Sequence, residues 1–119
     1  MCLVASGAVK KTTNIVGYTV LPNAREILCG LYSKTLTALQ RLPKEAAYRR
    51  HTEQIIEQRL QIVQAETSIP IIEEQIGCGQ VEELVDHAER ELKLVGKMEE
   101  WQPWEPLVSD PPPGQWEWP

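Results

Sequence analysis

The sequence contains few cysteines and no long hydrophobic run. Cys2, Cys29 and Cys78 are odd in number and widely spaced. This pattern excludes a disulfide framework and a cysteine-based zinc site, and it suits a reducing compartment. No apolar stretch approaches the roughly 20 residues that a membrane-spanning helix needs. We therefore expect a protein without a direct membrane span.

The sequence also lacks a cluster of reactive side chains. His51 and His87 lie far apart, and neither belongs to a histidine pair with metal-ligand spacing. Adjacent glutamates such as Glu73 and Glu74 diverge by about 100° on a helix, so they form a solvated face rather than an acid–base pair. Cys78 lies in a Gly-Cys-Gly turn that is poorly preorganised for thiol catalysis. We therefore expect no enzyme activity, no catalytic, cofactor-binding or metal-binding residue, and no small-molecule substrate.

Charge is divided unequally between the two halves of the chain. The net charge is −5, but residues 1–65 carry nine Lys and Arg against four Asp and Glu, whereas residues 66–119 carry three against thirteen. The nine cations form no dense basic run and are not interleaved with aromatic residues, so nucleic acid binding is not expected. The opposite charges predict that the two halves attract each other or attract different partners.

The first half of the chain contains two segments with the apolar periodicity of one-sided helices. The first segment begins at Asn23, which together with Glu26 resembles a capping box, and it ends at Pro43. The second runs from Pro43, which suits a first helical turn, to about Glu66. Arg59 is an exception on this second helix, because it lies near the middle of the apolar stripe. Either its stem packs while its charge reaches water, or it forms a partly buried ion pair with the acidic third helix or with a partner.

The second half begins with a short helical segment, Ile69–Ile76, and a turn at which Gly77 is expected to be the C-cap. The third long helix follows, from Gln80 to about Trp101. Its apolar residues form one buried seam, and charged residues such as Glu82 and Asp86 are expected on the opposite, water-facing side. Three one-sided helices with short connections predict an all-α fold, an antiparallel three-helix bundle at residues 23–101.

Two non-helical arms are predicted to flank this bundle. Residues 1–22 are β-branched and glycine-containing without a helical period, so they form an extended N-terminal arm. Residues 102–119, preceded by Trp101, form a Trp/Pro-rich extended C-terminal arm, because the prolines exclude a continuous helix or an interior strand. All four tryptophans and six of the nine prolines lie between residues 101 and 119. Exposed indole rings are costly, so this arm is expected to lie along a groove.

The groove belongs either to this chain or to a partner. One bundle of this size offers limited room for four indoles, which favours contact with a partner by at least part of the arm. The candidate partner-binding residues are Trp101, Trp104, Pro106, Trp116, Trp118 and, on the second helix, Arg59.

Several short motifs, in order and spacing, are shared with a known family. They are Lys10-Lys11-Thr12-Thr13 with Ile15-Val16-Gly17, Ala47-Tyr48-Arg49-Arg50 with Thr52-Glu53-Gln54-Ile55, Gly79-Gln80-Val81-Glu82-Glu83, Lys97-Met98 with Trp101, Trp104-Glu105-Pro106-Leu107, Pro111-Pro112 and Gln115-Trp116-Glu117-Trp118-Pro119. With these motifs, nearly the whole chain resembles the accessory alpha-subcomplex subunit 5 family (13 kDa B subunit) of mitochondrial NADH:ubiquinone oxidoreductase, respiratory complex I.

The resemblance implies an all-helical, non-catalytic accessory subunit without flavin, cluster or quinone. It implies a peripheral position on the matrix side of the mitochondrial inner membrane, where the subunit binds other complex I subunits, mainly the core 30 kDa iron–sulfur protein. Its implied function is to support assembly and stability of the matrix arm during electron transfer from NADH to ubiquinone. The alternative is a free-standing helical adaptor that binds other proteins through its Trp/Pro arm.

Overall fold

The computed structural model describes residues 10–118, and all regular secondary structure in this range is helical. Four helices follow one another, and no strand occurs in this part of the chain: α2 (Ala24–Leu39), α3 (Ala47–Ala65), α4 (Ile69–Ile76) and α5 (Val81–Trp101). The predicted all-α class is confirmed, and the short helix has the predicted bounds. Among the described helices, none is long and apolar enough to cross a bilayer.

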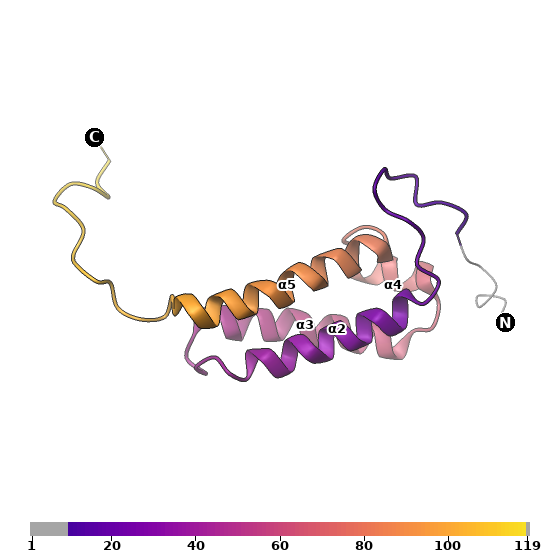
Figure 1. The fold of residues 1–119 in the computed structure, drawn as a ribbon, viewed down its shortest axis with the longest axis horizontal. Coiled ribbons are helices and arrows are strands. Elements are labelled where there is room, and N and C mark those ends of the chain that lie inside the picture. Colours follow the sequence, from indigo (N-terminus) through magenta and orange to yellow (C-terminus); the bar gives the residue numbers. More distant parts are fainter. Residues whose placement is uncertain (1–9, 119) are drawn as a thin grey trace.

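The three long helices lie side by side, with α2 packed against both of the others (Figure 1). α2 and α5 run in the same direction, and α3 runs in the opposite direction. α3 and α5 approach each other much less closely than either approaches α2. The arrangement is therefore asymmetric, because α3 and α5 both pack on α2 and only loosely on each other.

The core lies along α2 and is divided into two clusters. The larger cluster surrounds Leu28 and Tyr32 of α2, with residues from every other helix, among them Val63, Ile72 and Leu84. The smaller one surrounds Leu39 and Val95, with the residues Ala38, Leu42, Tyr48, Leu92, Met98 and Trp104. Each fully buried aliphatic side chain contributes roughly 1.5 to 3 kcal/mol. These two clusters therefore fix α3 and α5 to α2 along most of its length.

α2 begins as predicted, with Asn23 at the N-cap position, but the Asn23 side chain forms no capping hydrogen bond, so the predicted capping box does not form. The two helix ends predicted at Pro43 are wrong. α2 ends at Leu39 and α3 begins only at Ala47, because the residues between them form turns, one of which is closed by the Ala46 N–H donating to the Pro43 carbonyl at 3.1 Å. Leu42 is buried in this connection, so the apolar pattern continues beyond the helix that it was assigned to.

The start of α5 is held by backbone and carboxylate contacts around two glycines. Gly77 has a φ of +70° and caps α4, as predicted. Gly79 has a φ of +97°, and a Cβ there would collide with the Glu83 carboxylate. Glu83 accepts a hydrogen bond from the Gln80 N–H at 2.8 Å, and Glu73 accepts one from the Val81 N–H at 2.7 Å. Two amides that the helix itself leaves unpaired are thereby satisfied.

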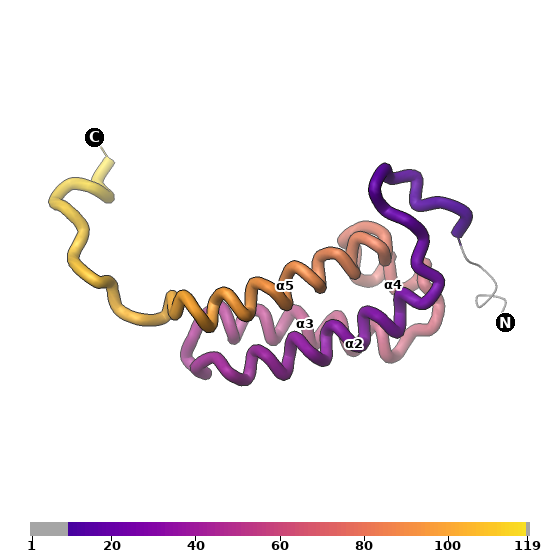
Figure 2. The backbone as a smooth tube through the Cα atoms, in the orientation of Figure 1, coloured from indigo at the N-terminus to yellow at the C-terminus, as the bar shows by residue number. Residues whose placement is uncertain are grey.

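The segments before α2 and after α5 lie at opposite ends of the molecule (Figure 2). Residues 10–23 have no helix or strand, and they turn back over the start of α5. Residues 102–118 have no helix or strand either, and they run away from the helices. We call these segments the N-terminal arm and the C-terminal arm.

Candidate partner-binding surfaces

The N-terminal arm is fastened to α4 and α5 by a buried ion pair. The Lys10 ammonium lies 2.5 Å from a Glu82 carboxylate oxygen and 2.9 Å from a Glu73 oxygen. The residue Glu82 is only 3% exposed. The expectation that Glu82 faces water is therefore wrong, because the N-terminal arm covers this part of the charged side of α5 and supplies the counter-ion.

Further hydrogen bonds extend this attachment along the arm. The Leu21 N–H donates to Glu82 at 3.3 Å, and the Gln80 side chain donates to the Thr13 carbonyl at 2.6 Å. The Tyr18 hydroxyl donates to Asp86 at 2.9 Å. The pKa of Tyr18 is raised above its ordinary value, mainly by this hydrogen bond. The arm thus uses both its own side chains and its own backbone to bind side chains at the start of α5.

The attachment also shifts the pKa of Lys10. Burial alone lowers it, but the hydrogen bonds and negative charges of Glu82 and Glu73 outweigh burial and leave the pKa above its ordinary value.

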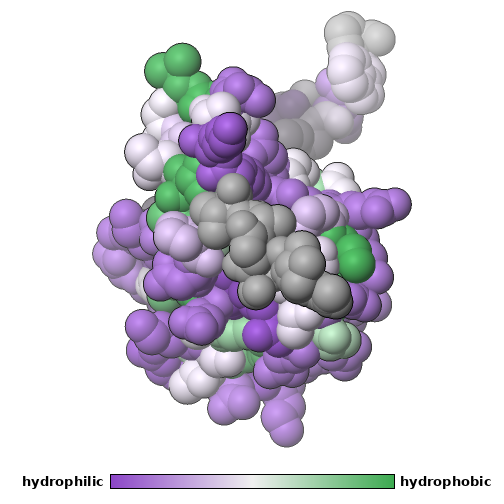
Figure 3. Space-filling model, turned by 90° about the vertical axis from the view of Figure 1, so that its right-hand side faces the viewer, coloured by the Kyte–Doolittle hydropathy of each residue, from purple (hydrophilic) through white to green (hydrophobic). Residues whose placement is uncertain are grey.

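Figure 3, which looks at the end of the molecule where this arm lies, shows mostly hydrophilic side chains with separate hydrophobic groups. This view presents no broad hydrophobic patch outside the grey atoms.

Unlike the N-terminal arm, the C-terminal arm exposes large hydrophobic side chains to water. Trp116 is 77% exposed, Trp118 is 95% exposed and Trp101, at the end of α5, is 61% exposed. Pro106 is exposed as well, and so are the neighbouring Leu107 and Val108. Four of the five predicted binding residues between 101 and 118, namely Trp101, Pro106, Trp116 and Trp118, therefore present apolar surface to water.

Trp104 is the exception, because it lies against its own domain. It is half-buried against the cluster that contains Tyr48 and Met98. A shallow cavity of about 230 Å³ adjoins it, lined by Ala46, Ala47, Tyr48, Met98, Pro103 and Trp104. One indole of the tail therefore has a site on this chain, and three do not.

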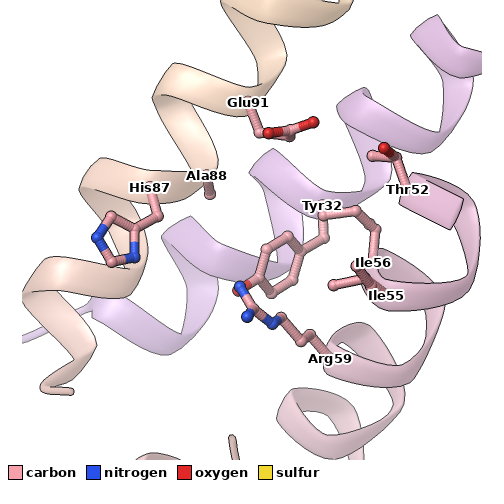
Figure 4. A pocket seen from close by; sticks show the side chains of 8 residues that line it. All are labelled: Tyr32, Thr52, Ile55, Ile56, Arg59, His87, Ala88 and Glu91. Atoms are coloured by element: carbon pink, nitrogen blue, oxygen red, sulfur yellow. The ribbon is translucent and has the colours of Figure 1, made fainter. Parts of the chain in front are cut away.

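A second candidate surface is the groove between α3 and α5 (Figure 4). It has a volume of about 270 Å³, and its lining residues are Tyr32 of α2, Thr52, Ile55, Ile56 and Arg59 of α3, and His87, Ala88 and Glu91 of α5. We call it the α3–α5 groove. It exists because α3 and α5 both pack on α2 and not closely on each other.

Arg59, the remaining predicted binding residue, lies in this groove and far from the C-terminal arm. Its guanidinium lies beside the Tyr32 ring in Figure 4 and donates to the Cys78 sulfur at 3.3 Å. The sequence left open an ion pair between Arg59 and the third helix, but Arg59 forms no ion pair with any residue between 10 and 118. An ion pair with a partner stays a prediction.

The Tyr32 hydroxyl is buried and has no hydrogen-bond partner among the described residues. Burial raises the pKa of Tyr32, and the nearby Arg59 charge opposes part of that rise. The phenol is therefore neutral at ordinary pH and keeps its proton as a donor. At the other end of the groove, the Tyr48 hydroxyl donates to Glu91, and burial together with this hydrogen bond raises the pKa of Tyr48.

The histidines take no part in a reactive cluster within the described range. His51 is exposed on α3, and His87 is exposed at the rim of the groove. Residues 10–118 contain no group of three or more His, Cys, Asp or Glu side chains with the spacing of a metal site. The two candidate surfaces are suited to binding. The C-terminal arm presents exposed indoles, and the α3–α5 groove presents the Arg59 guanidinium beside apolar side chains.

Comparison with known proteins finds similarity along almost the whole chain. A family model described as "ETC complex I subunit conserved region" matches residues 17–83. NADH dehydrogenase (ubiquinone) 1 alpha subcomplex subunit 5 of Bos taurus is 48% identical over 114 residues, covering 96% of this chain and 98% of the relative. The protein of the same name from Mus musculus has the same identity and coverage. An Arabidopsis thaliana protein named "Probable NADH dehydrogenase (ubiquinone) 1 alpha subcomplex subunit 5, mitochondrial" is 51% identical over 96 residues, or 81% of this chain and 57% of the relative.

Proposed function

We propose, from the premise that this chain belongs to the family of complex I alpha subcomplex subunit 5, that it supports the assembly and stability of the matrix arm of mitochondrial complex I. As a member of this family it is a complex I subunit, and its partners are other complex I subunits. In this proposal the helices form a rigid body, residues 23–101, and the two flanking segments, 1–22 and 102–119, attach to it and to its neighbours. Electron transfer from NADH to ubiquinone is carried out by other subunits.

The observation that carries the proposal is the exposure of Trp101, Trp116 and Trp118. An indole can bury about 150 to 250 Å², and tryptophan is enriched among the residues that dominate protein interfaces. Three such rings in water would lower the solubility of a free-standing chain, whereas a neighbouring subunit can cover them. The segment therefore fits an attachment to a larger assembly.

The finer parts of the proposal concern position and partner. We place the chain on the matrix side of the inner membrane, as a peripheral subunit, with the core 30 kDa iron–sulfur protein as its main neighbour. The non-catalytic role is supported by the use that the fold makes of its titratable groups: Lys10, Glu73 and Glu82 bind one another, and Tyr48 binds Glu91.

Removal of residues 101–119 tests the proposal. In cells that lack the wild-type protein, the truncated chain should fail to restore the mature matrix arm on native gels, and NADH oxidation by complex I should fall. Unchanged incorporation and unchanged NADH oxidation would contradict the role of the C-terminal arm.

A separate experiment distinguishes the proposal from the adaptor alternative. The tagged wild-type chain should co-purify with the flavin-bearing and cluster-bearing subunits of complex I. If it is recovered instead with other proteins and without those subunits, the chain acts as an adaptor and the proposal is wrong.

A further inference from the structure

The α3–α5 groove contains a positive charge that the chain does not compensate. Four cationic side chains are half-buried among the described residues: Lys10, Arg25, Arg49 and Arg59. The first pairs with two glutamates, the second donates to three backbone carbonyls, and the third contacts a glutamate and a backbone carbonyl. Within residues 10–118, only Arg59 of these four has neither a carboxylate nor a backbone carbonyl as partner.

The groups around Arg59 are weak substitutes for an anion. Its guanidinium donates to the Cys78 sulfur, and a thiol is a weak acceptor. The Tyr32 hydroxyl, which faces the same guanidinium in Figure 4, also lacks a hydrogen-bond partner. The Tyr32 hydroxyl is buried, and leaving it without a partner costs free energy. Arg59 is half-buried beside it, so one acceptor from outside the chain can serve both donors.

The volume and the apolar lining of the groove suit a side chain of another protein. Its volume of about 270 Å³ lies below the roughly 300 to 1,000 Å³ of ordinary small-molecule pockets. Ile55 remains 49% exposed beside it, although it belongs to the apolar face of α3. A neighbouring chain can cover this isoleucine while one of its own charged side chains reaches the guanidinium.

We infer that the α3–α5 groove receives the carboxylate of an aspartate or glutamate from a neighbouring complex I subunit, with Arg59 as its ion-pair partner. This inference rests on the proposed function and adds a second attachment, on a different face from the C-terminal arm. The planar guanidinium suits a carboxylate because it can donate two parallel hydrogen bonds. The Tyr32 hydroxyl lies next to it as a further donor.

Chemical crosslinking in the assembled complex tests the inference. The substitution Arg59→Lys places an amine in the groove, and a carbodiimide joins an amine to a carboxylate only when the two are in contact. The expected product is an amide between position 59 and an Asp or Glu of another subunit, identified by mass spectrometry. Arg50→Lys is the matched control, because Arg50 is exposed on the same helix, and it should give no such product in comparable yield.

Two crosslinking results would overturn the inference in a complex that contains the Arg59→Lys chain. One is the absence of any link from position 59 to another subunit. The other is a link only to a carboxylate of this chain, such as Glu91 in the same groove.

A binding measurement covers the case in which the crosslinking variant is poorly incorporated. Arg59→Met keeps the apolar stem and removes the charge, and it should bind to complex I depleted of this subunit about tenfold or more weakly than the wild-type chain. Arg50→Met should bind within about twofold, and circular dichroism should show both variants folded. Equal binding by the Arg59→Met and Arg50→Met variants would overturn the inference. Failure of the wild-type chain to bind would instead contradict the proposed function.

Discussion

The two arms of this protein are both without helix or strand in the described range, yet they relate to the helices in opposite ways. The N-terminal arm places Lys10 against a buried glutamate and Thr13 in the interior. The C-terminal arm places Trp116 and Trp118 in water. Charged and polar contacts make the N-terminal arm part of the fold, whereas the C-terminal arm leaves Trp116 and Trp118 exposed and packs only Trp104 against the helices.

This contrast shows that hydrophobic content alone does not decide which segment packs. An ion pair and several hydrogen bonds fasten the N-terminal arm because α5 offers matching carboxylates at its start. The C-terminal arm has the stronger hydrophobic gain available, but among its described large apolar side chains only Trp104 lies against a hydrophobic cluster of the helices, and Leu107, Val108, Trp116 and Trp118 are exposed. Its free energy of burial is therefore available for binding a partner.

The largest expected effect concerns the exposed tryptophans. The double substitution Trp116→Ala and Trp118→Ala should weaken incorporation into complex I by about 1,000-fold, because each interface tryptophan can contribute about 2 kcal/mol or more. The free energy of unfolding of the isolated chain should stay within about 0.5 kcal/mol of the wild type. Competition binding to subunit-depleted complex I and urea denaturation measure the two quantities. Val16→Ala, an equally exposed substitution in the N-terminal arm, should change neither; an equal loss of incorporation would break the contrast between the arms.

The next effect concerns the ion pair of the N-terminal arm. Lys10→Met should lower the free energy of unfolding by about 3 kcal/mol, because it leaves the buried Glu82 carboxylate without its cation. Lys11→Met is the matched control, since Lys11 is exposed, and it should change stability by less than about 0.5 kcal/mol. Urea denaturation of the isolated chain provides both values. If the two variants were equally stable, the N-terminal arm would be no more a part of the fold than the C-terminal arm.

A smaller effect should distinguish Trp104 from the rest of its arm. Trp104→Ala should destabilise the isolated chain by about 1 to 2 kcal/mol, less than the roughly 3 to 5 kcal/mol of a fully buried tryptophan, because the ring is only half-buried. Trp116→Ala should have no measurable effect on the same thermal or urea transition. Equal destabilisation by both substitutions would show that the whole arm packs on the helices.

The smallest effect is on the pH dependence of stability. The pKa values of Lys10, Tyr18, Tyr32 and Tyr48 are all raised in the folded chain. A raised pKa contributes stability that is complete below the pKa of the unfolded state, near 10.5 for lysine and 10.0 for tyrosine, and is lost as the pH rises through the folded value. Stability should therefore be flat with respect to these groups between pH 7 and 9 and fall above about pH 10. Truncation after Pro106 should leave this profile unchanged, because it retains all four groups and also Trp104, which lies against Tyr48; a changed profile would show that the exposed end of the C-terminal arm affects one of these groups.

Apolar periodicity predicts the helices well, because each long helix has one buried seam. The α4 bounds and the Gly77 cap follow from local chemistry, a proline in the first turn and a glycine with positive φ. The capping box at Asn23 is wrong because the same residue pattern does not require the side chain to turn toward the helix. Helix ends next to Pro43 are also wrong, since an apolar residue such as Leu42 can be buried equally well in a turn.

The burial of Glu82 and the groove between α3 and α5 could not be predicted from the apolar periodicity of the sequence. Glu82 belongs to the charged side of α5, and only the path of the N-terminal arm over that side explains its burial. The separation of α3 from α5, and with it the groove around Tyr32, depends on how two helices pack on a third. One signal was present in the sequence: Arg59 lies within an apolar stripe, and it proves to line that groove.

The central claim, that the C-terminal arm is a partner-binding segment and not part of this chain's own fold, can be tested by hydroxyl-radical footprinting of its tryptophans. The free chain and the chain within purified complex I are oxidised under the same conditions, and each indole is quantified by mass spectrometry. Oxidation of Trp116 and Trp118 should be high in the free chain and at least about tenfold lower in the complex, because interface tryptophans are desolvated, while the half-buried Trp104 serves as the internal reference. Equal oxidation of Trp116 and Trp118 in both states would contradict the claim.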